Sequence, residues 1–139
     1  MLNAILVDSG PLIALFDRSD NYHDRIKTFL RDFFPCRLVS TLAVLTEVSH
    51  MLDFSIDAQL DFLEWVMRGG LCLEAVEQDD MAKLTGLIRK YRDLPCDLAD
   101  ATLVLVAEKT GIHSIISIDS DFDIYRLPGK MLIKNIFRG

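Results

Sequence analysis

Four acidic residues of this chain occupy positions where a carboxylate is costly. Asp8 and Asp119 each come directly after a short apolar run, and Asp100 and Glu47 each interrupt a mostly apolar segment of helical period. Burying an ionised carboxyl group without a partner is strongly destabilising. Carboxylates that lie close together also repel each other, and a divalent cation is a common way to stabilise such a cluster at neutral pH. The four acids therefore predict a metal site.

The types of side chain indicate which metal this would be. Asp97 lies three residues before Asp100, a spacing that places both carboxylates on one side of a helix. Oxygen ligands without histidine or cysteine favour Mg²⁺ or Mn²⁺ over Zn²⁺. Such ions activate water and neutralise phosphate charge, which indicates hydrolysis of a phosphodiester. The sequence offers no rival motif: phosphate-binding glycine loops, a nucleophile elbow and a zinc-protease helix are all missing.

Short apolar runs alternate with helical patterns along the chain. Strands are predicted at residues 3–8, 37–40, 71–76, 113–118 and 131–136. Six helices are predicted between them: at about 11–16, then one capped by Ser19 or Asp20, one from Ser40 or Thr41 to Met51, one opened by Ser55 and ended by Gly69, one at about 78–92, and one from Asp97 to Lys109.

This alternation predicts an α/β fold with a mainly parallel sheet of about five strands, covered by helices on both faces. Ligands of such sheets gather at the carboxyl ends of the strands, which is where Asp8 and Asp119 stand. The chain has no internal repeat, low-complexity segment or glycine/serine-rich linker. We therefore expect a single domain spanning residues 1–139.

Composition limits the class of protein further. The 139 residues are 50% hydrophobic, which suits a folded domain with its own core, and the three cysteines are too widely spaced for a ligand motif. No run is apolar and long enough for a signal peptide or a membrane helix, so we expect a soluble, cytoplasmic protein. The net charge of −6 disfavours binding of nucleic acid by bulk electrostatics. The excess of acid lies in residues 1–80, whereas the remainder is slightly basic.

Four short motifs, taken in order, resemble those of the PIN domain, and most closely those of VapC-type toxins. They are Val7-Asp8-Ser9, Thr46-Glu47-Val48, Asp100-Ala101 and the run 117–122, SIDSDF. Each motif is weak alone, but their order and spacing are jointly specific and cover nearly the whole chain. The resemblance implies a three-layer α/β/α fold and a Mg²⁺- or Mn²⁺-dependent endoribonuclease.

The resemblance also assigns roles to individual residues. Asp8, Asp100 and Asp119 would hold the metal, Glu47 would position or deprotonate the attacking water, and Asp97 and Asp121 would be auxiliary metal ligands. Ser9 and Ser117 would support the carboxylates or a metal-bound water. Ser120 stands where the family often has a basic or polar residue, which leaves phosphate contact to Arg18, Arg89, Arg92 or Arg126.

Partners follow from the same resemblance. It implies an RNA substrate, a small antitoxin protein and a homodimer, for which the apolar helices within residues 42–67 would provide the surface.

Other interpretations stay open at this stage. Asp8 and Asp97 would also serve as helix caps, and Asp119 could open a turn. The chain could be a catalytically inactive PIN-like module that binds RNA or protein, although clustered repelling acids serve no purpose in a scaffold. A metal-dependent phosphatase or phosphoacceptor domain is disfavoured, because Asp8 is followed by Ser9-Gly10 and not by a second acid two residues on.

Overall fold

A five-stranded parallel sheet forms the centre of the molecule, in the strand order β3-β2-β1-β4-β7. The computed structural model describes residues 3–33, 36–94, 96–118, 121–127 and 131–137. The strands are β1 (Ala4–Val7), β2 (Arg37–Ser40), β3 (Cys72–Leu73), β4 (Ser114–Ile116) and β7 (Lys134–Asn135). Their order and direction confirm the parallel α/β sheet expected from the sequence.

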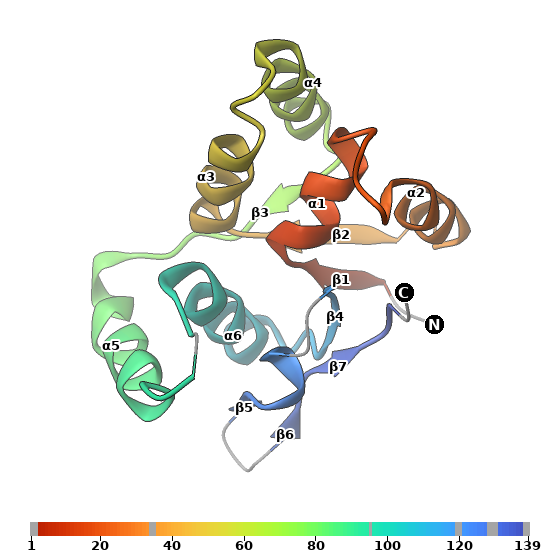
Figure 1. Cartoon of the computed structure of the whole chain (residues 1–139). Helices are drawn as coiled ribbons and strands as arrows, with labels where there is room; N and C mark the ends of the chain where they lie inside the picture. Colours follow the sequence, from red (N-terminus) through yellow and green to blue (C-terminus); the bar gives the residue numbers. More distant parts are fainter. Residues whose placement is uncertain (1–2, 34–35, 95, 119–120, 128–130, 138–139) are drawn as a thin grey trace.

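Helices cover both faces of this sheet, which makes the three-layer α/β/α arrangement. Figure 1 shows α1 (Ser9–Phe16), α2 (His23–Asp32) and α4 (Ile56–Met67) gathered on one side and α5 (Met81–Lys90) and α6 (Leu98–Thr110) on the other. The helix α3 (Leu42–Met51) packs against both α1 and α6. Two short 3₁₀ helices, η1 (Gln78–Asp80) and η2 (Asp121–Asp123), precede α5 and β5.

Local capping explains where most of these helices begin. The side chains of Asp8, Thr41, Ser55 and Asp97 each accept a backbone N–H in the first turn of α1, α3, α4 and α6. At the end of α6, Gly111 takes the left-handed conformation, with φ of 76°, that favours glycine. The capping interpretations of Asp8 and Asp97 are thus confirmed.

Two sequence predictions about these elements are wrong. The expected cap of the second helix, Ser19 or Asp20, does not start it: α2 begins at His23, and the Asp20 carboxylate accepts the Tyr22 N–H in the preceding turn. The predicted strand 131–136 is two strands in two sheets. Its first part, β6 (Met131–Leu132), pairs antiparallel with β5 (Arg126–Leu127), and β7 alone joins the main sheet.

The core is formed by the sheet together with buried side chains of helices on both of its faces. Ile5, Leu6 and Val7 of β1 are fully buried, as are Ile115 and Ile116 of β4. Residues 99–107 of α6 are buried without a break, as expected from a helix that is apolar on nearly all sides. This helix therefore fixes the position of Asp100 rigidly against the sheet.

A pair of glycine variants tests the packing of the outer helices α5 and α4. Gly86 lies inside α5 with open space around it, so Gly86→Ala should raise the free energy of unfolding by about 0.5–1 kcal/mol. A Cβ at Gly70 would overlap the indole ring of Trp65, which packs on Phe16, so Gly70→Ala should destabilise the protein. Urea unfolding monitored by circular dichroism measures both. Equal stability of the two variants would contradict this account of the packing.

Candidate active site

Asp8 is placed at the carboxyl end of β1 by its pairing with β4. Val7 lies opposite Ile116, and the Asp8 N–H donates to the Ile116 carbonyl at 3.0 Å. The side chain is 3% exposed, with Oδ1 accepting the Ser9 N–H at 2.8 Å and Oδ2 accepting the Ser117 hydroxyl at 3.0 Å. Charge-assisted hydrogen bonds of this kind stabilise a buried carboxylate and fix its orientation.

Ser9 connects this carboxylate to α3. Its hydroxyl donates to Oε1 of Glu47 at 2.5 Å, across 38 residues of sequence. The Glu47 side chain is half-buried. The structure therefore brings together four of the residues expected at the site: Asp8, Ser9, Glu47 and Ser117.

Asp100 lies in the first turn of α6 and is 8% exposed. Its N–H donates to Asp97 Oδ1 at 2.9 Å, and its Oδ2 accepts the hydroxyl of Tyr125 at 3.0 Å. Burial, followed by the charge of Asp100 and this hydrogen bond, raises the pKa of Tyr125 well above its ordinary value. The hydroxyl keeps its proton at neutral pH and serves as a neutral donor.

A buried threonine pair holds the start of α6 at the same edge of the sheet as Asp8. Thr41 follows β2 directly, and its hydroxyl bonds to that of Thr102 at 2.8 Å. Since β1 and β2 are neighbouring parallel strands, Asp8 and Thr41 lie at one edge. Thr102 is two residues beyond Asp100 on α6. The acids on β1, α3 and α6 are thus carried by elements that meet at the carboxyl edge of the sheet.

Two predicted ligands are not located by the structure. Asp119 lies outside the described residues, and of Asp121 only the backbone in η2 is described. Among the residues that are described, no group of three or more His, Cys, Asp or Glu side chains is close enough to hold a metal ion. The four-acid site therefore stays a prediction. What the described part does provide is a set of carboxylate oxygens, on buried Asp8 and Asp100, half-buried Glu47 and exposed Asp97, and such oxygens fit Mg²⁺ or Mn²⁺.

Four arginines are expected from the sequence to contact phosphate. Arg18, Arg89 and Arg92 are exposed, and no hydrogen bond or ion pair within the described ranges joins them to the acids. Arg126 uses Nη1 to donate to the carbonyls of Asp123 and Tyr125. Part of the Arg126 guanidinium is thus hydrogen-bonded within its own turn. Phosphate binding by any of the four arginines stays a prediction.

Sequence analysis missed two residues that support the acids. Asn135, at the end of β7, accepts the Ser117 N–H at 3.2 Å and the Phe137 N–H at 3.1 Å, and donates to the Ser117 carbonyl at 3.0 Å. It thereby fixes the backbone of the residue whose hydroxyl contacts Asp8. Its signal was an amide inside the apolar run MLIKNI. The other is Tyr125, whose fully buried ring has no local sequence signal.

Comparison with known proteins agrees with this geometry. The sequence model of the PIN domain family matches residues 5–127. The chain belongs to the PIN domain family.

Two relatives have the VapC name. Ribonuclease VapC26 of Mycobacterium tuberculosis is 23% identical over 117 residues, which are 83% of this chain and 86% of that protein. The crystal structure of Mycobacterium tuberculosis VapC20, described as a sarcin-ricin loop cleaving toxin, aligns with a TM-score of 0.76 and 21% identity. That alignment covers 84% of this chain and 91% of VapC20 and confirms the fold. Within the described part of the chain, none of the helices has the length and apolar character needed to cross a membrane.

The role of Asn135 gives a stability prediction. Asn135→Ala removes three hydrogen bonds and leaves buried backbone groups of Ser117 without these partners, so we expect a loss of about 2–4 kcal/mol in the free energy of unfolding. Asn21 is exposed, and Asn21→Ala should change stability by less than about 0.5 kcal/mol. Denaturant unfolding measures both, and a wild-type stability of Asn135→Ala would show that β7 does not fix this end of β4.

Proposed function

We propose that the protein is a Mg²⁺- or Mn²⁺-dependent endoribonuclease of the VapC type. The observation that carries this proposal is the placement of buried Asp8 and Asp100, with half-buried Glu47, on elements that meet at the carboxyl edge of a PIN-fold sheet. The VapC names of both relatives support RNA as the substrate. The acidic residues explain why a metal is needed, because RNA phosphates would otherwise be repelled by them.

Asp8, Asp100 and Asp119 are the proposed metal ligands, with Asp97 and Asp121 as auxiliary ones. When bound, Mg²⁺ or Mn²⁺ would supply charge neutralisation at the phosphodiester and at the departing 3′ oxygen. Ser117 and the Ser9 N–H hold the Asp8 carboxylate in a fixed orientation. These contacts come from neutral groups, so they add no positive charge that would repel a cation.

Glu47 is the proposed general base. The Ser9 hydroxyl engages Oε1, which leaves Oε2 to take the proton of the attacking water. The water oxygen forms a bond to phosphorus as the bond to the 3′ oxygen breaks, and protonation of that oxygen gives a 3′-hydroxyl end. The phosphate stays on the 5′ end of the other fragment.

Asparagine variants test the proposed ligands. In Asp100→Asn the amide oxygen can still accept the Tyr125 hydroxyl. In Asp8→Asn the amide oxygen can accept the Ser9 N–H while the NH₂ group faces the Ser117 hydroxyl, which can accept as well as donate. Both variants lose the charge that holds the cation. We expect cleavage of structured and unstructured RNA to fall at least about 100-fold in each, with melting temperatures equal to or above the wild type because like charges no longer repel. Gel assays in Mg²⁺, Mn²⁺ and EDTA measure cleavage.

Asp61→Asn, an exposed acid of α4, is the matched control and should cleave at the wild-type rate. Wild-type cleavage by both active-site variants, or cleavage that persists in EDTA, would refute the proposal. RNA binding without any cleavage by the wild type would favour the inactive binding module.

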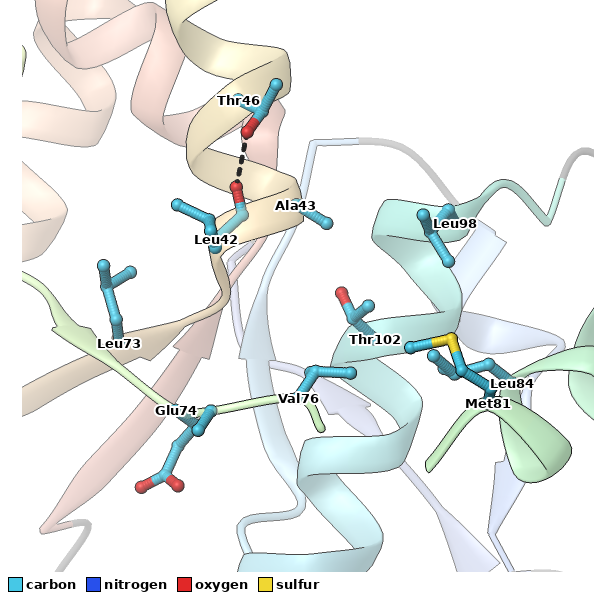
Figure 2. Close-up of a pocket in the computed structure, with 11 residues that line it drawn as sticks. Leu42, Ala43, Thr46, Leu73, Glu74, Val76, Met81, Leu84, Leu98 and Thr102 are labelled. Atoms are coloured by element: carbon cyan, nitrogen blue, oxygen red, sulfur yellow. Dashed lines mark hydrogen bonds between the residues drawn. The ribbon is translucent and has the colours of Figure 1, made fainter. Parts of the chain in front are cut away.

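Exposed apolar side chains support the proposed homodimer and antitoxin. On α4, Ile56, Leu60, Leu63 and Met67 form one stripe at helical spacing, with Met67 77% exposed. A second surface is a groove of about 580 Å³ beside the N-terminal ends of α3 and α6 (Figure 2). Its rim includes Leu42, Met81 and Leu98, all more than 45% exposed. Exposed apolar areas of this kind are typical of protein interfaces.

Charged variants on each surface test the dimer. We propose that one of the two surfaces binds a second copy, so Leu42→Glu or Leu60→Glu should give a monomer of 15.8 kDa where the wild type has twice that mass. Light scattering after size exclusion measures the mass, and Asp61→Ser on α4 is the control. A wild type that is already monomeric, or dimers in both glutamate variants, would contradict this assignment.

A further inference from the structure

The contact between Tyr125 and Asp100 is a hydrogen bond between two buried side chains that lie 25 residues apart. Tyr125 is fully buried, Asp100 is 8% exposed, and the hydroxyl donates to Oδ2 at 3.0 Å. The ring follows η2, the segment that includes Asp121, whereas the carboxylate belongs to α6. The bond therefore links the segment that follows the motif of residues 117–122 to α6, the helix that carries Asp100.

Neighbouring rings hold this hydroxyl in place. Phe122 meets the Tyr125 ring edge-to-face, with centroids 5.2 Å apart, and Tyr91 packs on it at 5.0 Å. A ring fixed by packing and by its own chain neighbours has little freedom to turn, so the direction of its O–H bond toward Asp100 is set by the fold.

We propose that Tyr125 is a positioning residue for the metal site: by holding Oδ2 it fixes the orientation of the Asp100 carboxylate that would bind the cation. This inference depends on the proposed function, because it assumes that Asp100 is a metal ligand. A phenol suits the task since it is a donor without charge, whereas a lysine or arginine in its place would compete with the cation. Groups that orient a ligating carboxylate contribute strongly to metal affinity.

Tyr125→Phe tests this role because it removes the hydroxyl and keeps the ring. We expect Mn²⁺ to bind about 10–100-fold more weakly than to the wild type, as measured on the protein alone by electron paramagnetic resonance or calorimetry. Cleavage should need a correspondingly higher Mn²⁺ concentration, with excess Mn²⁺ restoring kcat and with KM for RNA unchanged. A merely structural loss would not be rescued by metal.

Tyr91→Phe is the matched control, since it loses a hydrogen bond of similar length from the adjacent buried ring without touching Asp100. Its Mn²⁺ affinity should stay within about twofold of the wild type, whereas an equal loss in both variants would show that packing is responsible and overturn the inference. Adding Tyr125→Phe to Asp100→Asn should weaken Mn²⁺ binding no further than Asp100→Asn alone, because the hydroxyl acts through that carboxylate. Additive losses would also overturn it.

The outcomes separate this inference from the function on which it rests. If Asp8→Asn and Asp100→Asn lose Mn²⁺ while Tyr125→Phe binds it like the wild type, the nuclease proposal holds and the role of Tyr125 is refuted. If the wild type binds no Mn²⁺, both proposals fail together. Circular dichroism melting of each variant establishes that the comparison is made on folded protein.

Discussion

Parallel pairing of β1 with β4 is the constraint on which the candidate site depends most. It places Asp8 beside Ser117, so that the first carboxylate receives a hydroxyl donor from the neighbouring strand. The pairing of β4 with β7 then brings Asn135 to Ser117 from the other side. Because side chains alternate between the two faces of a strand, a slip of one residue in either pairing would turn these groups away from each other.

Burying carboxylates at the carboxyl edge of the sheet lowers the stability of the protein. Hydrogen bonds from neutral donors offset this loss of stability. Asp8 receives a backbone N–H and a serine hydroxyl, Asp100 receives a phenol, and Glu47 receives a second serine hydroxyl. An arginine or lysine in contact would stabilise the acids more strongly. It would also neutralise the negative charge that attracts a cation. Neutral donors thus orient the carboxylates and keep their charge, a compromise typical of sites that give up stability for function.

Sequence predicted correctly those helix starts that depend only on neighbouring residues. Thr41, Ser55 and Asp97 start their helices as expected, since a cap needs only the three residues that follow it. The start of α2 was misjudged because Asp20 bonds within the turn and not within the helix. The strand 131–136 was misjudged because apolar periodicity does not say which partner each part of a run pairs with.

The acids themselves were identifiable because a carboxylate in an apolar run is conspicuous, and the structure brings Asp8 and Glu47 into one hydrogen-bonded group through Ser9. The partners of Asn135 and Tyr125 were not identifiable from sequence alone. Their roles come from contacts across 18 and 25 residues, and nothing in their own segments specifies those partners. Sequence thus indicates which side chains could do chemistry, whereas only the fold shows which side chains hold them.

Each support of the candidate site is also a connection between elements that are distant in sequence. Ser9–Glu47 joins α1 to α3, Thr41–Thr102 joins the start of α3 to α6, and Tyr125–Asp100 joins α6 to the segment after η2. The acids therefore reach the edge of the sheet only when the layers have packed, since each of the three bonds needs two elements that are distant in sequence. An amide in place of a carboxylate keeps these connections and removes the charge. Loss of a supporting hydroxyl keeps the charge and removes the connection. The two kinds of variant therefore distinguish the contribution of the charge from the contribution of the hydrogen bond that positions it.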